Sequence, residues 1–292
     1  MIPENNVAGN VVGNVKRFSG FEDEYDRFRP AAPQMVVDIL TEYLDARPSL
    51  VIDIGCGTGL SSFIWRDHAD RIVGVEPSPD MIRKAQDKLR RLDRNDGEDL
   101  PDGSDRADAR INLSFVQGYS NRLDFAAGAA DIVTCSQSFH WMEPSSTLQE
   151  AGRVLRKGGV FAAYDCDWPP TVHWEIEQQY ISLLDRVDAI TAALPPERDA
   201  VRKWRKEEHL ANMIASNAFQ FTKEIVFHDT QPCDAQRYVG LALSQGGLQA
   251  IHKVDPMLLD GDIAAFRDRV EAHFRGRTLD VIFSYRMRVG VK

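Results

Sequence analysis

One segment, VIDIGCGTG at residues 51–59, constrains the fold more than any other part of the chain. Its apolar start is typical of a buried strand, and Gly55, Gly57 and Gly59 stand at the alternate positions of a tight strand-to-helix turn. Glycine has no Cβ, so the backbone of such a turn can approach a ligand closely. The segment therefore predicts a strand, a ligand-binding turn and a helical stretch from Leu60 to about Ala69.

The residues around the turn discriminate between two classes of nucleoside ligand. A dinucleotide fold would place a third glycine at position 60 and the pyrophosphate on the helix N-terminus. Position 60 is Leu60, and Asp53, two residues before Gly55, would repel a pyrophosphate. A carboxylate here favours a ligand with positive charge, and the ammonium and sulfonium of S-adenosylmethionine fit that requirement.

A second acid follows the second apolar segment. Ile72, Val73 and Val75 predict a short strand that ends at Glu76. An acid at the end of the second strand, about 20 residues after the glycine turn, is placed to accept hydrogen bonds from both ribose hydroxyls. Glu76 thus indicates a nucleoside and Asp53 indicates which one; the alternative for Glu76 is a solvated acid at a strand end.

Five motifs in order along the chain resemble class I S-adenosylmethionine-dependent methyltransferases: VIDIGCGTG, GVEPSPDM, QGYSNRLDF, ADIVTCSQSFHW and LRKGG. They cover about residues 18–164. YDRFRP, SQSFHW and SYRMRVGVK are similar to the small-molecule branch that contains trans-aconitate methyltransferases. The resemblance implies an α/β fold, a doubly wound seven-stranded mostly parallel sheet of the Rossmann-like methyltransferase type with a helical cap, and S-adenosyl-L-methionine as cofactor.

The predicted cofactor residues lie where ligands bind in open α/β sheets, beyond the carboxyl ends of the strands. They are Asp53, Gly55, Cys56, Gly57, Gly59, Glu76, Pro77, Met81, Tyr119, Ser120, Asn121 and Ser136, together with Arg29. The family often has an acid for the adenine amino group where this chain has Tyr119. We expect Ser120 and Asn121 to supply polar contacts, Tyr119 to stack, and Met81 to pack against the base.

Four residues near the N-terminus resemble the family's lid over the cofactor: Phe18, Tyr25, Arg29 and Pro30. In a lid, Arg29 would pair with the methionine carboxylate or an acidic substrate, and Tyr25 would face the transferred methyl. The alternative is an amphipathic helix that simply packs Phe21, Tyr25 and Phe28 on the body.

The predicted acceptor side of the site contains His140 and Tyr25 as catalytic residues, and Trp141 and Trp168 as substrate contacts. Methyl transfer from a sulfonium needs alignment more than acid catalysis, and a base only when the acceptor carries a proton. His140 is accordingly either a base for a phenol or alcohol or, as the trans-aconitate resemblance favours, a positioning group for a carboxylate, with Arg29, Lys203 or Arg205 balancing the charge. The alternative is a histidine that bonds to the backbone and closes the floor of the cleft with Trp141. No histidine spacing suggests a metal site, and we predict none.

Composition limits the class of acceptor. A net charge of -9 argues against general nucleic-acid binding, and the Asn-Pro-Pro-aromatic motif of adenine-amino methyltransferases is absent after the fourth strand. Four cysteines without CxxC pairing indicate a reducing compartment. The first fourteen residues lack the apolar segment of a signal peptide, and no apolar run in the chain is long enough to span a bilayer. We expect a cytoplasmic protein with a small-molecule substrate and no nucleic-acid or membrane partner; its oligomeric state stays open.

The chain divides by pattern into four predicted segments. They are a lid at 1–30, a cofactor-binding core at 31–165, a helical cap at 166–217, and a C-terminal completion of the sheet at 218–292. The remaining predicted strands are 111–116, 131–135, 160–165, 219–227 and an antiparallel 279–291. We expect Ser145 or Ser146 to cap a helix that runs through Leu155, and further helices at 173–191, 197–217, 233–244 and 262–274.

Two functions follow from these observations. The favoured one is S-adenosylmethionine-dependent methyl transfer to a small-molecule acceptor by direct displacement, at a carboxylate or hydroxyl oxygen rather than nitrogen. The alternative is a catalytically silent S-adenosylmethionine-binding protein with a regulatory or scaffolding role, because binding and chemistry separate in this fold. Methyl transfer to a panel of metabolites distinguishes the two.

Overall fold

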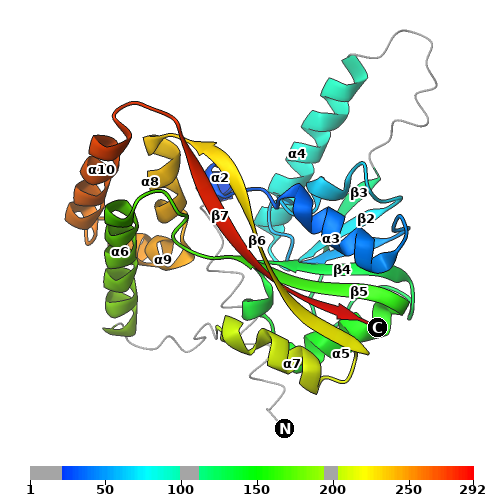
Figure 1. Cartoon of the computed structure of the whole chain (residues 1–292). Helices are drawn as coiled ribbons and strands as arrows, with labels where there is room; N and C mark the ends of the chain where they lie inside the picture. Colours follow the sequence, from blue (N-terminus) through cyan, green and yellow to red (C-terminus); the bar gives the residue numbers. More distant parts are fainter. Residues whose placement is uncertain (1–21, 99–111, 194–202) are drawn as a thin grey trace. The chain divides into compact units, whose positions relative to one another are not determined.

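The computed structural model describes residues 22–98, 112–193 and 203–292. Phe18 and Phe21 lie outside the described residues, as do the beginning of the helix expected at 197–217 and the first residue of the strand expected at 111–116. In Figure 1, helices follow several of the strands along the chain.

The sheet has seven strands in the order β3-β2-β1-β4-β5-β7-β6. Pairings from β3 through β5 are all parallel. The strands are β1 Val51–Ile54, β2 Ile72–Glu76, β3 Leu113–Gln117, β4 Ala130–Ser136, β5 Leu155–Cys166, β6 Phe221–Cys233 and β7 Leu279–Val291. The chain order reverses between β1 and β4, which makes that boundary the switch point of the sheet. The prediction of a doubly wound, seven-stranded, mostly parallel sheet is confirmed.

The last strand runs against β5. Gly158 N donates to Lys292 O, whereas Asp167 N donates to Ser284 O, so residue numbers rise on one strand as they fall on the other. The predicted bounds of this strand, 279–291, are those that the structure has.

By internal contacts the chain separates into two compact units, which we call the sheet unit and the helical unit. The sheet unit comprises Ala31–Asp165, Arg202–Ile225 and Met287–Lys292, and the helical unit comprises Met1–Pro30, Cys166–Val201 and Val226–Arg286. The division into lid, core, cap and C-terminal segments stays a prediction.

The sheet unit has its own core and helices. Its core includes Ile52, Val133, Phe139, Phe161 and Met213, all fully buried or nearly so. β1 and β2 are buried along their whole length because helices cover parallel strands on both faces. The helical elements are α3 Gln34–Leu44, η1 Phe63–Trp65, α4 Pro79–Glu98, η2 Phe139–Trp141, α5 Pro144–Val154, η3 Lys206–Glu208 and α7 His209–Ala215.

The helical unit is built around aromatic side chains. Tyr180 of α6 packs edge-on against Tyr238 of α8 and Phe266 of α10, and all three are buried. The ring of Phe28 lies where a Cβ on Gly240 would be, at 2.2 Å from its nearest ring atom, so only glycine lets α2 approach α8 this closely. The helices are α2 Glu22–Phe28, α6 Trp174–Ala193, α8 Ala235–Leu243, α9 Gly246–Val254 and α10 Asp260–Phe274.

Two local predictions are wrong, and one helix was not predicted. Residues 60–69 form turns and the short η1 rather than a helix, because the hydroxyls of Ser61 and Ser62 bond inward to Asp53. Glu143, rather than a serine, caps α5 by accepting from the backbone N–H groups of Ser145 and Ser146. Helix α9 was not predicted, because the Gly-Gly pair at its start is typical of a turn.

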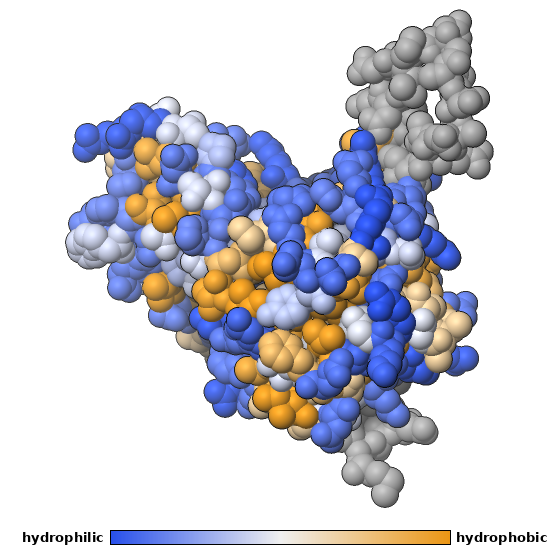
Figure 2. All heavy atoms as spheres, turned by 45° about the vertical axis from the view of Figure 1, so that its right-hand side comes forward, coloured by the Kyte–Doolittle hydropathy of each residue, from blue (hydrophilic) through white to orange (hydrophobic). Residues whose placement is uncertain are grey.

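The surface drawn in Figure 2 has patches of apolar residues among mostly hydrophilic ones. The most exposed large apolar side chains among the described residues are Met257, Trp174 and Val254. Exposed apolar side chains of this kind are usual on globular proteins. Among the described residues, no helix has the length and apolar character to cross a membrane.

Candidate active site

The glycines of the turn after β1 differ in the space around them. All three have positive φ, at 68° for Gly55, 55° for Gly57 and 86° for Gly59. A Cβ on Gly55 would lie 2.7 Å from the side chains of Ser138 and Met142, so close packing requires that glycine. A Cβ on Gly57 would meet nothing within 4 Å. The turn is therefore packed on one side and open at Gly57, as a cradle for a ligand requires.

Asp53 lies beneath this turn, fully buried. Its carboxylate accepts hydrogen bonds from Ser61 Oγ and Ser62 Oγ at 2.6 Å and from Thr134 Oγ1 at 2.9 Å. Burial raises the pKa of Asp53, although these three hydroxyls favour the ionised form. The sequence predicts that this carboxylate contacts the ligand, whereas in the structure its hydrogen bonds join the turn to the neighbouring strand. In this position Asp53 would affect cofactor binding by holding the turn in place.

Glu76, at the end of β2, faces the same turn. Its oxygens accept from the backbone N–H groups of Gly57 at 3.0 Å and Ser78 at 2.9 Å. Burial raises the pKa of Glu76 to about 7, against the effect of these two hydrogen bonds. Of the other predicted cofactor residues, Cys56 and Met81 are buried and Pro77 is half-buried. The carboxylate predicted for the ribose thus lies directly at the open glycine.

The loop after β3 carries the residues predicted for adenine. Tyr119 is 43% exposed, Asn121 is exposed, and Ser120 Oγ lies 2.8 Å from Thr147 Oγ1 of α5. Tyr119 is accordingly placed to stack, while the hydroxyl of Ser120 already has a partner. The adenine contacts of all three residues stay predictions.

The segment after β4 packs against the glycine turn. Ser136 ends β4, Gln137 takes a positive φ of 49°, and Ser138 Oγ donates to Ile54 O at 2.8 Å. This hydrogen bond and the packing on Gly55 fix η2, which carries His140 and Trp141, beside the turn. The structure therefore brings His140 and the predicted cofactor cradle to the same edge of the sheet.

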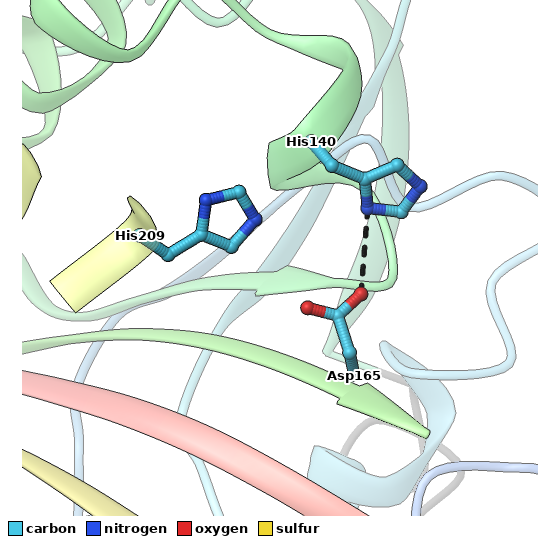
Figure 3. A group of neighbouring side chains, drawn as sticks. All are labelled: His140, Asp165 and His209. Atoms are coloured by element: carbon cyan, nitrogen blue, oxygen red, sulfur yellow. Dashed lines mark ion pairs between the residues drawn. The ribbon is translucent and has the colours of Figure 1, made fainter. Parts of the chain in front are cut away.

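His140 points its Nδ1 at Asp165, the penultimate residue of β5 (Figure 3). Nδ1 and Oδ1 are 3.4 Å apart, and both side chains are almost completely buried. Burial lowers the pKa of His140 to about 4, against the opposing effect of Asp165. His140 is therefore neutral at neutral pH, with a carboxylate behind its ring.

Two cations hold Asp165 in its ionised form. Lys206 Nζ lies 2.7 Å from Oδ1, and Arg288 Nη1 lies 3.6 Å from Oδ2. Arg288 also donates from Nε to Glu224 at 2.9 Å. Burial alone would raise the pKa of Asp165, but the contact with His140 and the charge of Lys206 outweigh it and keep the pKa below its ordinary value. The two carboxylates, of Asp165 and Glu224, and the two cations, Lys206 and Arg288, balance in charge.

His209, the first residue of α7, completes this cluster (Figure 3). Its ring packs edge-on against Phe139 with a centroid distance of 4.7 Å, and neither ring nitrogen has a hydrogen-bond partner among the described residues. Burial lowers the pKa of His209 to about 4. His140, Asp165 and His209 place three potential metal donor atoms within 4.8 Å. Because both oxygens of Asp165 already face a cation, a metal ion would have to displace Lys206, and we assign none.

Sequence reasoning missed four members of the cluster, namely Asp165, Lys206, His209 and Arg288. Asp165 could have been found by the rule that singled out Glu76, because it is an acid at the carboxyl end of a parallel strand. Lys206 is the neighbour of the exposed Lys203 and Arg205 that were proposed to balance charge. No pattern in the sequence indicates His209 or Arg288.

Three predicted site residues come together in the helical unit instead. The guanidinium of Arg29 lies 5.2 Å from the ring centre of Tyr25 and 4.7 Å from that of Trp168. It donates to Ser244 O and to Gln245 Oε1. These contacts order α2 and Arg29 within the helical unit, as the amphipathic-helix alternative requires; the predicted contacts with cofactor and methyl group stay untested.

Comparison with known proteins finds methyltransferases. Residues 52–163 match the family described as "Methyltransferase domain". A "Probable S-adenosylmethionine-dependent methyltransferase" of Saccharomyces cerevisiae is 25% identical over 141 residues, which are 47% of this chain and 43% of that protein. An "Uncharacterized methyltransferase-like" protein of Schizosaccharomyces pombe is 22% identical over 72% of this chain and 73% of its own length. The chain spans less than half the length of the first curated relatives that it matches.

Solved structures share the fold. A "Putative Type II Methyltransferase" of Anaeromyxobacter dehalogenans superposes with a TM-score of 0.60 at 19% identity, over 90% of this chain and 98% of that one. The YcgJ protein of a Bacillus gives a TM-score of 0.52 at 18% identity, over 89% of this chain and 99% of that one. At such identities the likeness concerns the fold. Together with the matched domain, it confirms the expected fold class.

Proposed function

We propose that the protein is a class I S-adenosylmethionine-dependent methyltransferase that transfers a methyl group to an oxygen atom of a small molecule; the match of residues 52–163 to a methyltransferase domain supports this. S-adenosylmethionine is the cofactor. When bound, it supplies a methyl group on a positively charged sulfur, which an acceptor oxygen displaces directly. The acceptor oxygen belongs to a carboxylate, as in the trans-aconitate branch, or to a hydroxyl group.

One observation carries the proposal: the segment with His140 is packed against the glycine turn through Ser138 and Met142. The turn and Glu76 would hold the nucleoside, because Gly57 leaves open space beside the carboxylate. An acceptor bound next to that nucleoside would meet η2. The predicted roles of Trp141 and Trp168 in holding the acceptor, and of Tyr25 and Arg29 in covering the cofactor, belong to the same proposal.

The acidic charge supports a small acceptor rather than a nucleic acid. A net charge of -9 opposes the counterion release that drives binding to a phosphate backbone. The residues after β4 are Ser136 to Trp141 rather than Asn-Pro-Pro-aromatic. We therefore place the acceptor among metabolites. Nothing observed favours the catalytically silent alternative.

Two measurements test the proposed function. S-adenosylhomocysteine should raise the melting temperature, because a ligand that binds only the folded state stabilises it by mass action. Incubation with methyl-labelled S-adenosylmethionine and a metabolite extract should yield a labelled small molecule, identified by mass spectrometry. Stabilisation without any transferred label would favour the silent binding protein, and no stabilisation would contradict the cofactor site.

A further inference from the structure

Asp165 determines which ring nitrogen of His140 carries the proton. Its carboxylate, held between Lys206 and Arg288, can only accept hydrogen bonds. Nδ1 faces Oδ1 at 3.4 Å; the two atoms do not form a hydrogen bond in this structure, and catalytic contacts of this kind commonly tighten when a substrate is bound. The favourable arrangement places hydrogen on Nδ1 and leaves a lone pair on Nε2.

Nε2 is the ring atom that faces away from Asp165 (Figure 3). The ring is carried by η2, whose flanking residues Ser138 and Met142 contact the glycine turn. Nδ1 is completely enclosed, so His140 can form a hydrogen bond with an acceptor molecule only through Nε2. A bound acceptor would therefore meet a hydrogen-bond acceptor at this position.

This arrangement discriminates between the two oxygen acceptors. A carboxylate has no hydrogen to give to a lone pair, and a neutral imidazole offers it no compensating charge. A hydroxyl group can donate its hydrogen to Nε2 and become more nucleophilic as it does so. The low pKa of His140, which follows from its burial, keeps the ring neutral in the range where the enzyme would work.

We propose that His140 is the catalytic base for an acidic hydroxyl group, a phenol or an enol, and that Asp165 is its positioning residue. This inference rests on the proposed function and narrows its substrate class. The hydroxyl proton passes to Nε2 while the oxygen forms its bond to the methyl carbon and the carbon–sulfur bond breaks, its electron pair remaining on sulfur. The imidazolium that results is paired with Asp165 and returns the proton to water.

The choice among hydroxyl groups follows from the chemistry of imidazole, which even with its ordinary pKa of about 6.5 is a weak base. Such a base removes a proton more effectively as the pKa of the hydroxyl group comes closer to its own. Phenols, with a pKa of about 10, meet that condition far better than aliphatic alcohols do. The acceptor is therefore an aromatic or enolic hydroxyl compound.

Several charged or titratable groups face His140 and bear on any pH dependence. Asp165 comes from β5, Lys206 from η3, and Lys203 from the segment before it. His209 of α7 lies next to the pair, and Arg288 of β7 and Glu224 of β6 reach it through Asp165. Among the described residues, Asp165 is the acid that directly contacts the His140 ring, and the same carboxylate also pairs with Lys206 and Arg288.

The tautomer of His140 tests the inference without any substrate. The full chain is labelled with 15N-histidine, and long-range proton–nitrogen spectra are recorded at pH 7. The His140 signals are identified by their loss in His140→Gln. We expect a neutral ring with hydrogen on Nδ1. A ring with hydrogen on Nε2, or a charged ring at pH 7, would overturn the proposal.

The chemistry of the methylated product tests the substrate class. With labelled S-adenosylmethionine and a metabolite extract, the label should appear in an O-methyl ether that survives mild alkali. A methyl ester, which alkali hydrolyses, or an N-methyl product would contradict the inference while leaving methyl transfer itself supported. Absence of any labelled product contradicts the proposed function, and the tautomer then stands as the test of His140.

Variants separate catalysis from structure. His140→Gln should lower turnover of the product-forming reaction by about 100-fold or more without changing the affinity for S-adenosylhomocysteine. Asp165→Asn should lower kcat and move the acid limb of the pH–rate profile, whereas Asp167→Asn, at an exposed residue two positions along, should change neither. Full turnover in His140→Gln, or an unmoved profile in Asp165→Asn, would refute the assigned roles.

Discussion

His209 makes the stability of the protein depend on pH. It is fully buried without a hydrogen-bond partner for either ring nitrogen among the described residues, and its pKa falls from the ordinary 6.5 to about 4. Because the folded-state value lies below the unfolded one, the folded state binds fewer protons. The contribution of neutral His209 to the free energy of unfolding is therefore complete above pH 6.5 and is lost as the pH falls from 6.5 towards 4.

The magnitude follows from the same two values. The whole difference corresponds to about 3 kcal/mol, at about 1.36 kcal/mol for each tenfold change in proton affinity. Between pH 7 and pH 5, where only part of the proton uptake occurs, the loss is about 2 kcal/mol. In His209→Phe the ring still packs against Phe139 and binds no proton, so that portion of the acid destabilisation should disappear.

The assay is urea unfolding of both proteins at pH 7 and pH 5. The unchanged chain should lose about 2 kcal/mol more free energy of unfolding over this interval than His209→Phe does. The contribution from Glu76 is the same in both proteins and cancels in the comparison, whereas His140 lies close enough to His209 for their charges to interact. His252→Gln, at an exposed residue of α9, controls for the loss of a histidine as such. Equal losses in the unchanged chain and in His209→Phe would refute the reasoning.

Three further predictions concern the cofactor site. Because Glu76 is protonated below a pKa of about 7, the affinity for S-adenosylhomocysteine measured by calorimetry should fall as the pH drops from 8 to 6. Glu76→Gln should bind S-adenosylhomocysteine weakly at every pH. An affinity that does not change with pH in the unchanged chain would contradict this role. Asp53→Ala leaves three buried hydroxyls without their acceptor and should lower the free energy of unfolding by about 2–4 kcal/mol, whereas unchanged stability would mean that the carboxylate does not hold the turn. Gly57→Ala should lower the free energy of unfolding by only about 1–2 kcal/mol of backbone strain yet abolish cofactor binding. Gly55→Ala places a methyl group against two side chains and should prevent folding. Normal cofactor binding by Gly57→Ala would show that the cofactor does not occupy the open space at Gly57.

The sequence by itself determined the strands and the turn between them. Buried parallel strands must be apolar throughout, and a tight turn must contain glycine, so the segment at 51–59 and the strand that ends at Glu76 could be predicted from local composition. The last strand was predicted with its observed bounds because its buried residues largely alternate. The order of five motifs was enough to predict the fold class.

Only the tertiary structure decided what the polar side chains face. Asp53 could have pointed at a ligand or into the protein; Thr134, 81 residues away, joins Ser61 and Ser62 in turning it inward. The same packing replaced the helix expected at 60–69 by turns. Local periodicity describes which face of an element is apolar, and contains no information about which distant hydroxyl will meet a buried carboxylate.

The cluster around His140 shows this limit most clearly. His140 alone had a position that recommended it in the sequence, and whether it was a base or a positioning group stayed open there. The answer depends on Asp165, Lys206 and Arg288, which come from β5, η3 and β7. A buried charge is tolerated only when opposite charges compensate it at short range, and those partners are brought together by the fold rather than by any spacing along the chain.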